Sequence, residues 1–126
     1  MLQLLAHLIG DYILQTDAMA TRKTKQSLWA LAHAVTYGLP FVFLTRSVLA
    51  LAVIVVTHFF IDRFRLARYV VAAKNSVTDW PLRSAFFASS TGYVEPTPAW
   101  MAVWLLIIAD NTLHLTINYA ALRWLP

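Results

Sequence analysis

The sequence predicts an all-α integral membrane protein, a four-span transmembrane helical bundle with a short interfacial helix between spans three and four. Hydrophobic residues make up 60% of the 126 residues and charged residues 13%, which is unlike a soluble domain. Four apolar runs, at residues about 2–19, 28–45, 48–66 and 99–122, approach the length that crosses a bilayer. Backbone groups in lipid must be satisfied within their own segment, which favours helices.

The length of the chain indicates a single domain over residues 1–126. The chain has no cysteine, which excludes disulfides and thiolate metal sites. Its net charge of +4 comes from basic residues that flank the apolar runs. That distribution is typical of membrane orientation, so we expect a lipid bilayer as partner and no nucleic acid.

The first apolar run is interrupted by Gln3, His7, Asp11 and Gln15, which fall close to one stripe of a helix. A cleaved signal peptide is the competing interpretation, because Ala18-Met19-Ala20 looks like a cleavage site. The absence of a basic start and the presence of an acid within the apolar core disfavour it. The polar stretch that follows, up to Ser27, is predicted to be a loop.

The second run contains one strongly polar interior residue, His33, and we expect Gly38 and Pro40 to kink it. The third run is rich in valine and isoleucine, so periodicity alone does not exclude a buried strand. Its length and its lack of turn residues favour a helix.

The stretch 75–98 is predicted to hold the short interfacial helix and then coil, with Pro98 opening the last helix. Aromatic residues near both ends of the last run mark its two membrane interfaces: Trp100, Trp104, Tyr119 and Trp124. The loops between successive spans carry three, one and five Lys and Arg residues when Arg63 and Arg65 at the end of the third run are counted with the loop that follows it. The positive-inside rule then places both termini on the non-cytoplasmic side of a bacterial inner membrane.

Histidines and aspartates gather in the apolar runs at one-turn spacing, which places the two members of each pair on the same helix face. The pairs are His7 with Asp11, His58 with Asp62 and, in reverse order, Asp110 with His114, while His33 is the remaining histidine. Three carboxylates within spanning helices would oppose insertion by roughly 8 to 10 kcal/mol. They must therefore be protonated, paired or bound to a cation.

Imidazole and carboxylate ligands together suit zinc, manganese or iron. We expect a divalent metal site built from His7, Asp11, His33, His58, Asp62, Asp110 and His114. Seven ligands exceed one tetrahedral site, which allows two metals or aspartates that hydrogen bond to ligating histidines. Two alternatives stay open: a proton or cation pathway in which the aspartates titrate, and a structural protein whose His–Asp pairs hold helices together.

The motifs Ala6-His7-Leu8-Ile9-Gly10-Asp11, Thr57-His58-Phe59-Phe60-Ile61-Asp62 and Asp110-Asn111-Thr112-Leu113-His114, together with the lone His33, carry a resemblance. The chain resembles an uncharacterised family of small bacterial and phage integral membrane proteins, domain of unknown function 3307. The resemblance implies a shared four-span fold and a common site at these positions, and it implies no activity. In style the sequence is also similar to small membrane-bound metal-dependent hydrolases.

Whether the protein is an enzyme is left open by the sequence. If it is one, the reaction we expect is hydrolysis of a lipid or lipid-linked phosphoester by metal-activated water, with Asp11, Asp62 and Asp110 as candidate catalytic residues. The sequence contains no phosphate-cradling glycine loop and no serine or cysteine nucleophile arrangement. A chain of this size is expected to form a homo-oligomer if it has to enclose a site.

Overall fold

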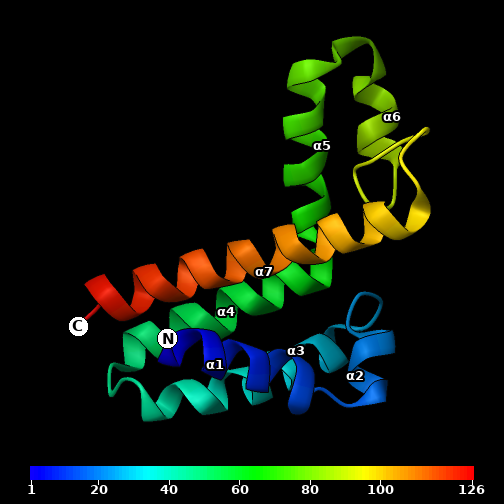
Figure 1. Cartoon of the computed structure of the whole chain (residues 1–126). Coiled ribbons are helices and arrows are strands. Elements are labelled where there is room, and N and C mark those ends of the chain that lie inside the picture. The colour runs from blue at the N-terminus through cyan, green and yellow to red at the C-terminus, as the bar shows by residue number, and fades with distance from the viewer. The chain divides into compact units, whose positions relative to one another are not determined.

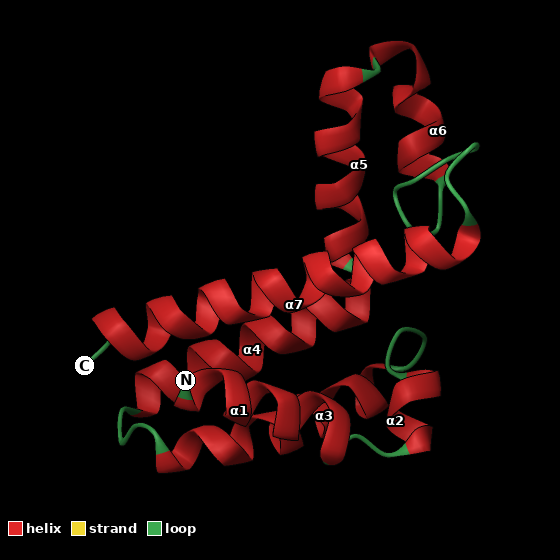
Figure 2. Ribbon diagram, in the orientation of Figure 1, coloured by secondary structure: helices red, strands yellow, loops and turns green.

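A computed structural model describes residues 1–126, and it contains seven α-helices and no strand (Figures 1 and 2). The chain divides into two compact units. The first unit comprises Met1–Phe64 with His114–Pro126, and the second comprises Arg65–Leu113.

The first unit is built from short helices and the C-terminal part of a long one. Its elements are α1 (Leu2–Leu8) with a π turn (Ile9–Ile13), α2 (Asp17–Arg22), α3 (Ser27–Gly38) with a 3₁₀ turn (Leu39–Phe43), α4 (Val48–Phe64) and the end of α7 (Ala99–Trp124). Its apolar core consists of Ala6, Tyr37, Phe41, Ala50, Ile54 and Ala121.

The prediction of four membrane spans is wrong. Only α7, with 26 residues, is long and apolar enough to cross a membrane. The run 2–19 is broken after residue 13, and Thr16 begins a new helix by accepting a hydrogen bond from the Met19 amide. The run 28–45 tightens into a 3₁₀ turn at Pro40, which has no amide hydrogen to donate.

The third predicted span, residues 48–66, also falls short. Helix α4 has 17 residues and stops before Arg65, whose φ of 52° lies in the left-handed region that ends helices. The predicted placement of both termini on one side of a membrane rested on four spans, and a single candidate span gives it no support.

The second unit contains α5 (Leu66–Thr78), a 3₁₀ turn (Trp80–Leu82), α6 (Arg83–Ala88) and the beginning of α7. The loop after α6 is held against α5 where Asn75 Nδ2 donates to the Gly92 carbonyl at 2.8 Å. Gly92 has a φ of 80°, and a Cβ there would lie 2.6 Å from the Arg68 carbonyl oxygen. The close approach of this loop to α5 therefore requires glycine.

Candidate metal centre

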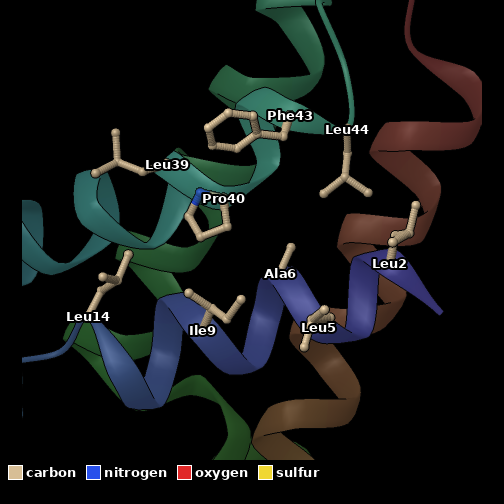
Figure 3. Close-up of a pocket in the computed structure, with 9 residues that line it drawn as sticks. All are labelled: Leu2, Leu5, Ala6, Ile9, Leu14, Leu39, Pro40, Phe43 and Leu44. Carbon is tan, nitrogen blue, oxygen red and sulfur yellow. The ribbon is translucent and has the colours of Figure 1, made fainter.

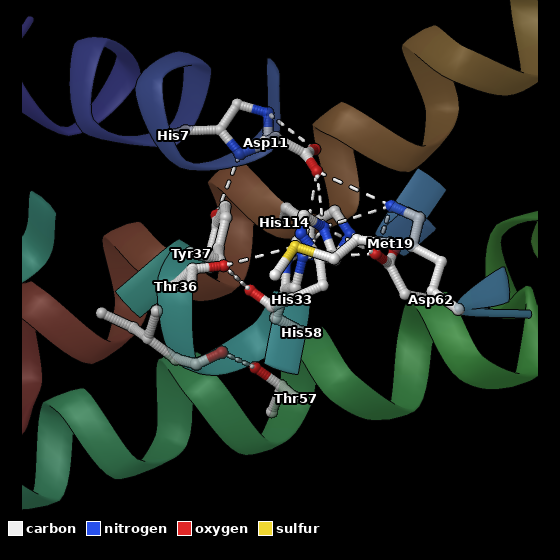
Figure 4. A network of polar contacts seen from close by, with 12 residues as sticks. His7, Asp11, Met19, His33, Thr36, Tyr37, Thr57, His58, Asp62 and His114 are labelled. Atoms are coloured by element: carbon white, nitrogen blue, oxygen red, sulfur yellow. Dashed lines mark hydrogen bonds and ion pairs between the residues drawn. The ribbon is translucent and has the colours of Figure 1, made fainter. Parts of the chain in front are cut away.

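Four buried side chains of the first unit converge on one point (Figure 4). They are Asp11 from the π turn, His33 from α3, and His58 and Asp62 from α4. Each offers one ligand atom, and the four atoms all lie within 4.8 Å of one another. None of the four residues is more than 6% exposed.

His33 Nε2 is at the centre of the contacts. It lies 3.1 Å from Asp11 Oδ1, 3.2 Å from Asp62 Oδ2 and 3.0 Å from His58 Nε2. Since Nδ1 of the same ring has no hydrogen-bond partner, Nε2 carries the polar contacts of this imidazole. A single N–H can be directed at only one acceptor, so hydrogen bonding alone does not account for three partners at these distances.

The local backbone explains how these atoms come together. His58 and Asp62 are one α-helical turn apart, which places His58 Nε2 3.3 Å from Asp62 Oδ2. Asp11 reaches the same point from α1 because Gly10 lets the π turn lie directly against α3. A Cβ on Gly10 would be 2.8 Å from the Tyr37 carbonyl oxygen.

The separations between these donor atoms fit a shared metal ion. Ligands bonded to one ion at about 2.0–2.1 Å in tetrahedral geometry lie roughly 3.3 Å from one another. The contacts of 3.0 to 3.3 Å that join His33 Nε2, His58 Nε2 and Asp62 Oδ2 are close to that value. Two imidazole nitrogens and two carboxylate oxygens form a donor set suited to zinc, manganese or iron.

The electrostatics at Asp11, His58 and Asp62 favour the protonation states that a metal requires. Burial acts to raise the pKa of Asp62, but contacts with His114, His33 and His58 bring it well below its usual value. Burial likewise opposes ionisation of Asp11, whereas its hydrogen bond from His33 brings its pKa down. Burial lowers the pKa of His58 to about 4, so this imidazole is neutral near pH 7.

His33 differs from His58. Burial acts to lower the pKa of His33, yet its contacts with Asp11 and Asp62 raise it above the usual value. A metal ion would have to replace the proton that these carboxylates stabilise on the ring. Competition between proton and metal at a histidine ligand is general for such sites.

Lys23 belongs to the cluster, although the sequence did not indicate it. Its Nζ lies 2.6 Å from Asp62 Oδ2, 3.2 Å from His33 Nε2 and 3.9 Å from Asp11 Oδ1. The sequence predicts a polar loop at this position, and a lysine in a polar loop is normally solvated. The available signal was the charge balance, because two buried carboxylates need a cation nearby.

Three predicted ligands lie outside the group of four. His114 contacts the far side of it, with Nδ1 3.2 Å from His58 Nδ1 and Nε2 3.4 Å from Asp62 Oδ1. His7 Nε2 is 3.9 Å from Asp11 Oδ2. Asp110 lies on α7 within the second unit and is not part of this group.

Tyr37, which the sequence did not single out, contacts the neighbouring histidines. Its ring stacks on the His58 imidazole with centroids 3.6 Å apart. Its hydroxyl accepts a hydrogen bond from Asn118 Nδ2 at 2.6 Å and is 2.9 Å from His7 Nδ1. A tyrosine in an apolar run is normally a core residue, which is why this role was missed.

A cavity of about 420 Å³ lies on another face of α1, lined by Leu5, Ile9, Leu39 and Phe43 among other apolar residues (Figure 3). None of the residues that line it carries a charged or metal-ligating side chain. It therefore contributes nothing to the chemistry of the His–Asp cluster.

The family model described as "Protein of unknown function (DUF3307)" matches residues 1–122. No curated protein and no solved structure matches the chain significantly.

Proposed function

We propose that this chain, which belongs to the DUF3307 family, binds a divalent metal ion between Asp11, His33, His58 and Asp62. One observation carries the proposal: His33 Nε2 lies within 3.2 Å of donor atoms from three other candidate ligands. The four ligands come from three helical segments, so one ion would join parts of the unit that are distant in sequence. Zinc, manganese and iron are the metals that this donor set favours.

Elemental analysis of purified protein never exposed to chelator tests the proposal. We expect close to one metal ion per wild-type chain and almost none in His58→Ala, because this variant lacks one of the four proposed ligands. Thr57→Ala is the matched control, since Thr57 is the neighbouring residue on α4 and its hydroxyl bonds only to backbone carbonyls of its own helix. Wild-type protein with only a small fraction of an ion per chain would refute metal binding.

We also propose a reaction for the metal-bound protein, which is hydrolysis of a lipid or lipid-linked phosphoester. A bound divalent ion lowers the pKa of a coordinated water and polarises a phosphoryl oxygen, which supports this reaction class. The apolar helix α7 supports a location near lipid. Metal-loaded wild type should release product from phospholipid in mixed micelles, and His58→Ala should not. An inactive wild type that retains its metal would contradict the reaction and leave the metal site in place.

A proton pathway is the second candidate. The observation that favours it is the succession of imidazole contacts from His33 to His58 at 3.0 Å and from His58 to His114 at 3.2 Å. Protein in liposomes would then conduct protons without added metal, and Asp62→Asn would abolish the flux while any copurified metal remained. In a purely structural protein, by contrast, a chelator would leave the melting temperature unchanged.

We propose that α7 holds the protein in a lipid bilayer, that of a bacterial inner membrane. The support is its 26-residue length and the exposure of Trp100, Trp104 and Ile108 along it. Carbonate-washed membranes should retain the protein. Recovery in the soluble fraction would overturn this placement, and crosslinking in the same membranes would test for a homo-oligomer.

A further inference from the structure

We propose that Lys23 is the specificity-determining residue of this site, a built-in ammonium that an incoming ion must displace and that selects divalent over monovalent cations. The inference rests on the proposed metal site. Lys23 would not bind the ion, but it would determine which ions can enter the site.

Lys23 and a metal ion cannot occupy the cluster together. A metal bonded to Asp62 Oδ2 and His33 Nε2 would lie about 2 Å from each. The Lys23 ammonium is already 2.6 Å from the first of these atoms and 3.2 Å from the second. Both cations would therefore compete for one position, and the Lys23 side chain must withdraw when the ion binds.

Charge explains the selectivity. Asp11 and Asp62 bring two negative charges, and Lys23 supplies one positive charge to a buried site. Exchanging the ammonium for a monovalent ion leaves that balance unchanged while giving up a contact already made. A divalent ion neutralises both carboxylates, and charge neutralisation is worth most where water is excluded.

The backbone holds Lys23 in place while its side chain can leave. Lys23 is the C-cap residue that follows α2, and the next residue is held because Arg63 Nη1 donates to the Thr24 carbonyl at 2.8 Å. Arg63 Nε also donates to Ser27 Oγ at 3.1 Å. The Lys23 side chain is 17% exposed, compared with 8% for Asp11 and 4% for Asp62, so it lies on the solvent side of the carboxylates.

The first test is metal affinity. Lys23→Met keeps most of the aliphatic stem and removes the charge, so the apparent affinity for Mn²⁺ or Zn²⁺ should rise by about tenfold or more. Potassium chloride should weaken Mn²⁺ binding in this variant more than in wild type at equal ionic strength. The control is Lys25→Met, because Lys25 is exposed on the same turn and contacts none of the four ligands.

The second test uses wild-type protein. Acetylation of Lys23 by an amine-reactive reagent, followed by mass spectrometry, should become several-fold faster when Mn²⁺ is added, because the displaced ammonium enters solvent. Acetylation of Lys25 should not change. This readout decides the matter even if Lys23→Met fails to fold.

The outcomes separate the two proposals. Metal binding by wild type with unchanged affinity in Lys23→Met, or with unchanged Lys23 acetylation if that variant does not fold, overturns the role of Lys23 and leaves the metal site standing. Absence of metal binding in both wild type and Lys23→Met overturns both proposals. Binding by Lys23→Met alone supports the inference in its strongest form, an ammonium that blocks the site.

Discussion

At the scale of single residues, the Tyr37 hydroxyl links the histidine cluster to the last helix. It is buried, contacts His7 Nδ1 and accepts a hydrogen bond from Asn118. Tyr37→Phe should retain the stacking on His58 and remove the buried contacts of the hydroxyl with His7 Nδ1 and Asn118 Nδ2. We expect a loss of about 1–3 kcal/mol in the free energy of unfolding.

Chemical denaturation measures that loss. The affinity for metal should fall by no more than roughly ten- to a hundredfold, as expected for a group that contacts a ligand and does not itself bind the ion. Tyr119→Phe removes a hydroxyl from an exposed tyrosine on α7 and is the control. Equal stability of Tyr37→Phe and wild type would contradict a structural role for the hydroxyl.

His58 should also make the stability of the metal-free protein depend on pH. Burial lowers its pKa from 6.5 to about 4. Between these values the unfolded chain binds a proton at His58 and the folded chain does not, so the free energy of unfolding falls as the pH is lowered. Each tenfold difference in proton affinity is worth about 1.4 kcal/mol, which gives up to about 3 kcal/mol over the interval.

Asp11, His33 and Asp62 contribute their pH dependence outside this window. The raised pKa of His33 stabilises the fold below pH 6.5, and that stability is lost only as the pH rises through the folded value. The lowered pKa values of Asp11 and Asp62 contribute stability above pH 3.8 that is lost below it. Denaturation in chelator should therefore show the slope between pH 4 and 6.5 in wild type, and His58→Gln should flatten it.

The spacing of histidines and aspartates identified most of the cluster from the sequence. Four residues apart on a helix is a local relation, and the structure brings Asp11, His33, His58 and Asp62 into one group. Their role as ligands stays a prediction. Lys23 could not be found in this way, since only the tertiary contact between α2 and α4 shows that it faces buried carboxylates.

At the scale of elements, the contact between the π turn and α3 depends on Gly10. A Cβ at this position would meet the backbone oxygen of Tyr37 at 2.8 Å and its ring at 2.9 Å, and the backbone atom cannot rotate away. Gly10→Ala should therefore separate the two segments, cost about 1–3 kcal/mol and carry Asp11 away from His33.

Melting temperature and metal affinity should both fall in Gly10→Ala. Leu8→Ala is the control, because Leu8 lies on α1 with its side chain partly exposed. A variant as stable as wild type with unchanged metal affinity would show that the segments can move apart without consequence for the site.

The apolar runs predicted where helices occur better than where they end. Hydropathy averages over many residues, whereas the ends depend on single ones. Thr16 caps a new helix, Pro40 lacks an amide donor and Arg65 adopts a left-handed conformation. The first two residue types can be recognised as helix boundaries, but arginine carries no preference for positive φ.

At the scale of the whole molecule, metal binding should affect the two units differently. All four proposed ligands lie in the first unit, Met1–Phe64 with His114–Pro126. A metal at a hundred times its dissociation constant stabilises the state that binds it by about 2.7 kcal/mol. Amide hydrogen exchange should slow in the first unit and stay unchanged in Arg65–Leu113. Equal slowing in both units would contradict the prediction.

Composition was informative about the class of protein and less so about its architecture. The apolar fraction of 60% contributed to the prediction of a four-span membrane protein, of which the all-α class is confirmed and the four spans are wrong. It could not show that the chain divides into two units, because the boundary at Arg65 lies within a stretch of continuous helical pattern. The division of α7 between the units is likewise invisible in its uniform hydropathy.

Because of that division, the two parts of the first unit are synthesised at different times. The four proposed ligands are synthesised by residue 62, but His114 and Asn118, which contact His58 and Tyr37, come after the whole of the second unit. At translation rates of about 5–20 residues per second, the nascent first unit waits on the order of several seconds for its last helix. During that interval His58 and Tyr37 lack their contacts with the last helix, so we expect an ion to reach the nascent ligands more readily than those of the finished protein.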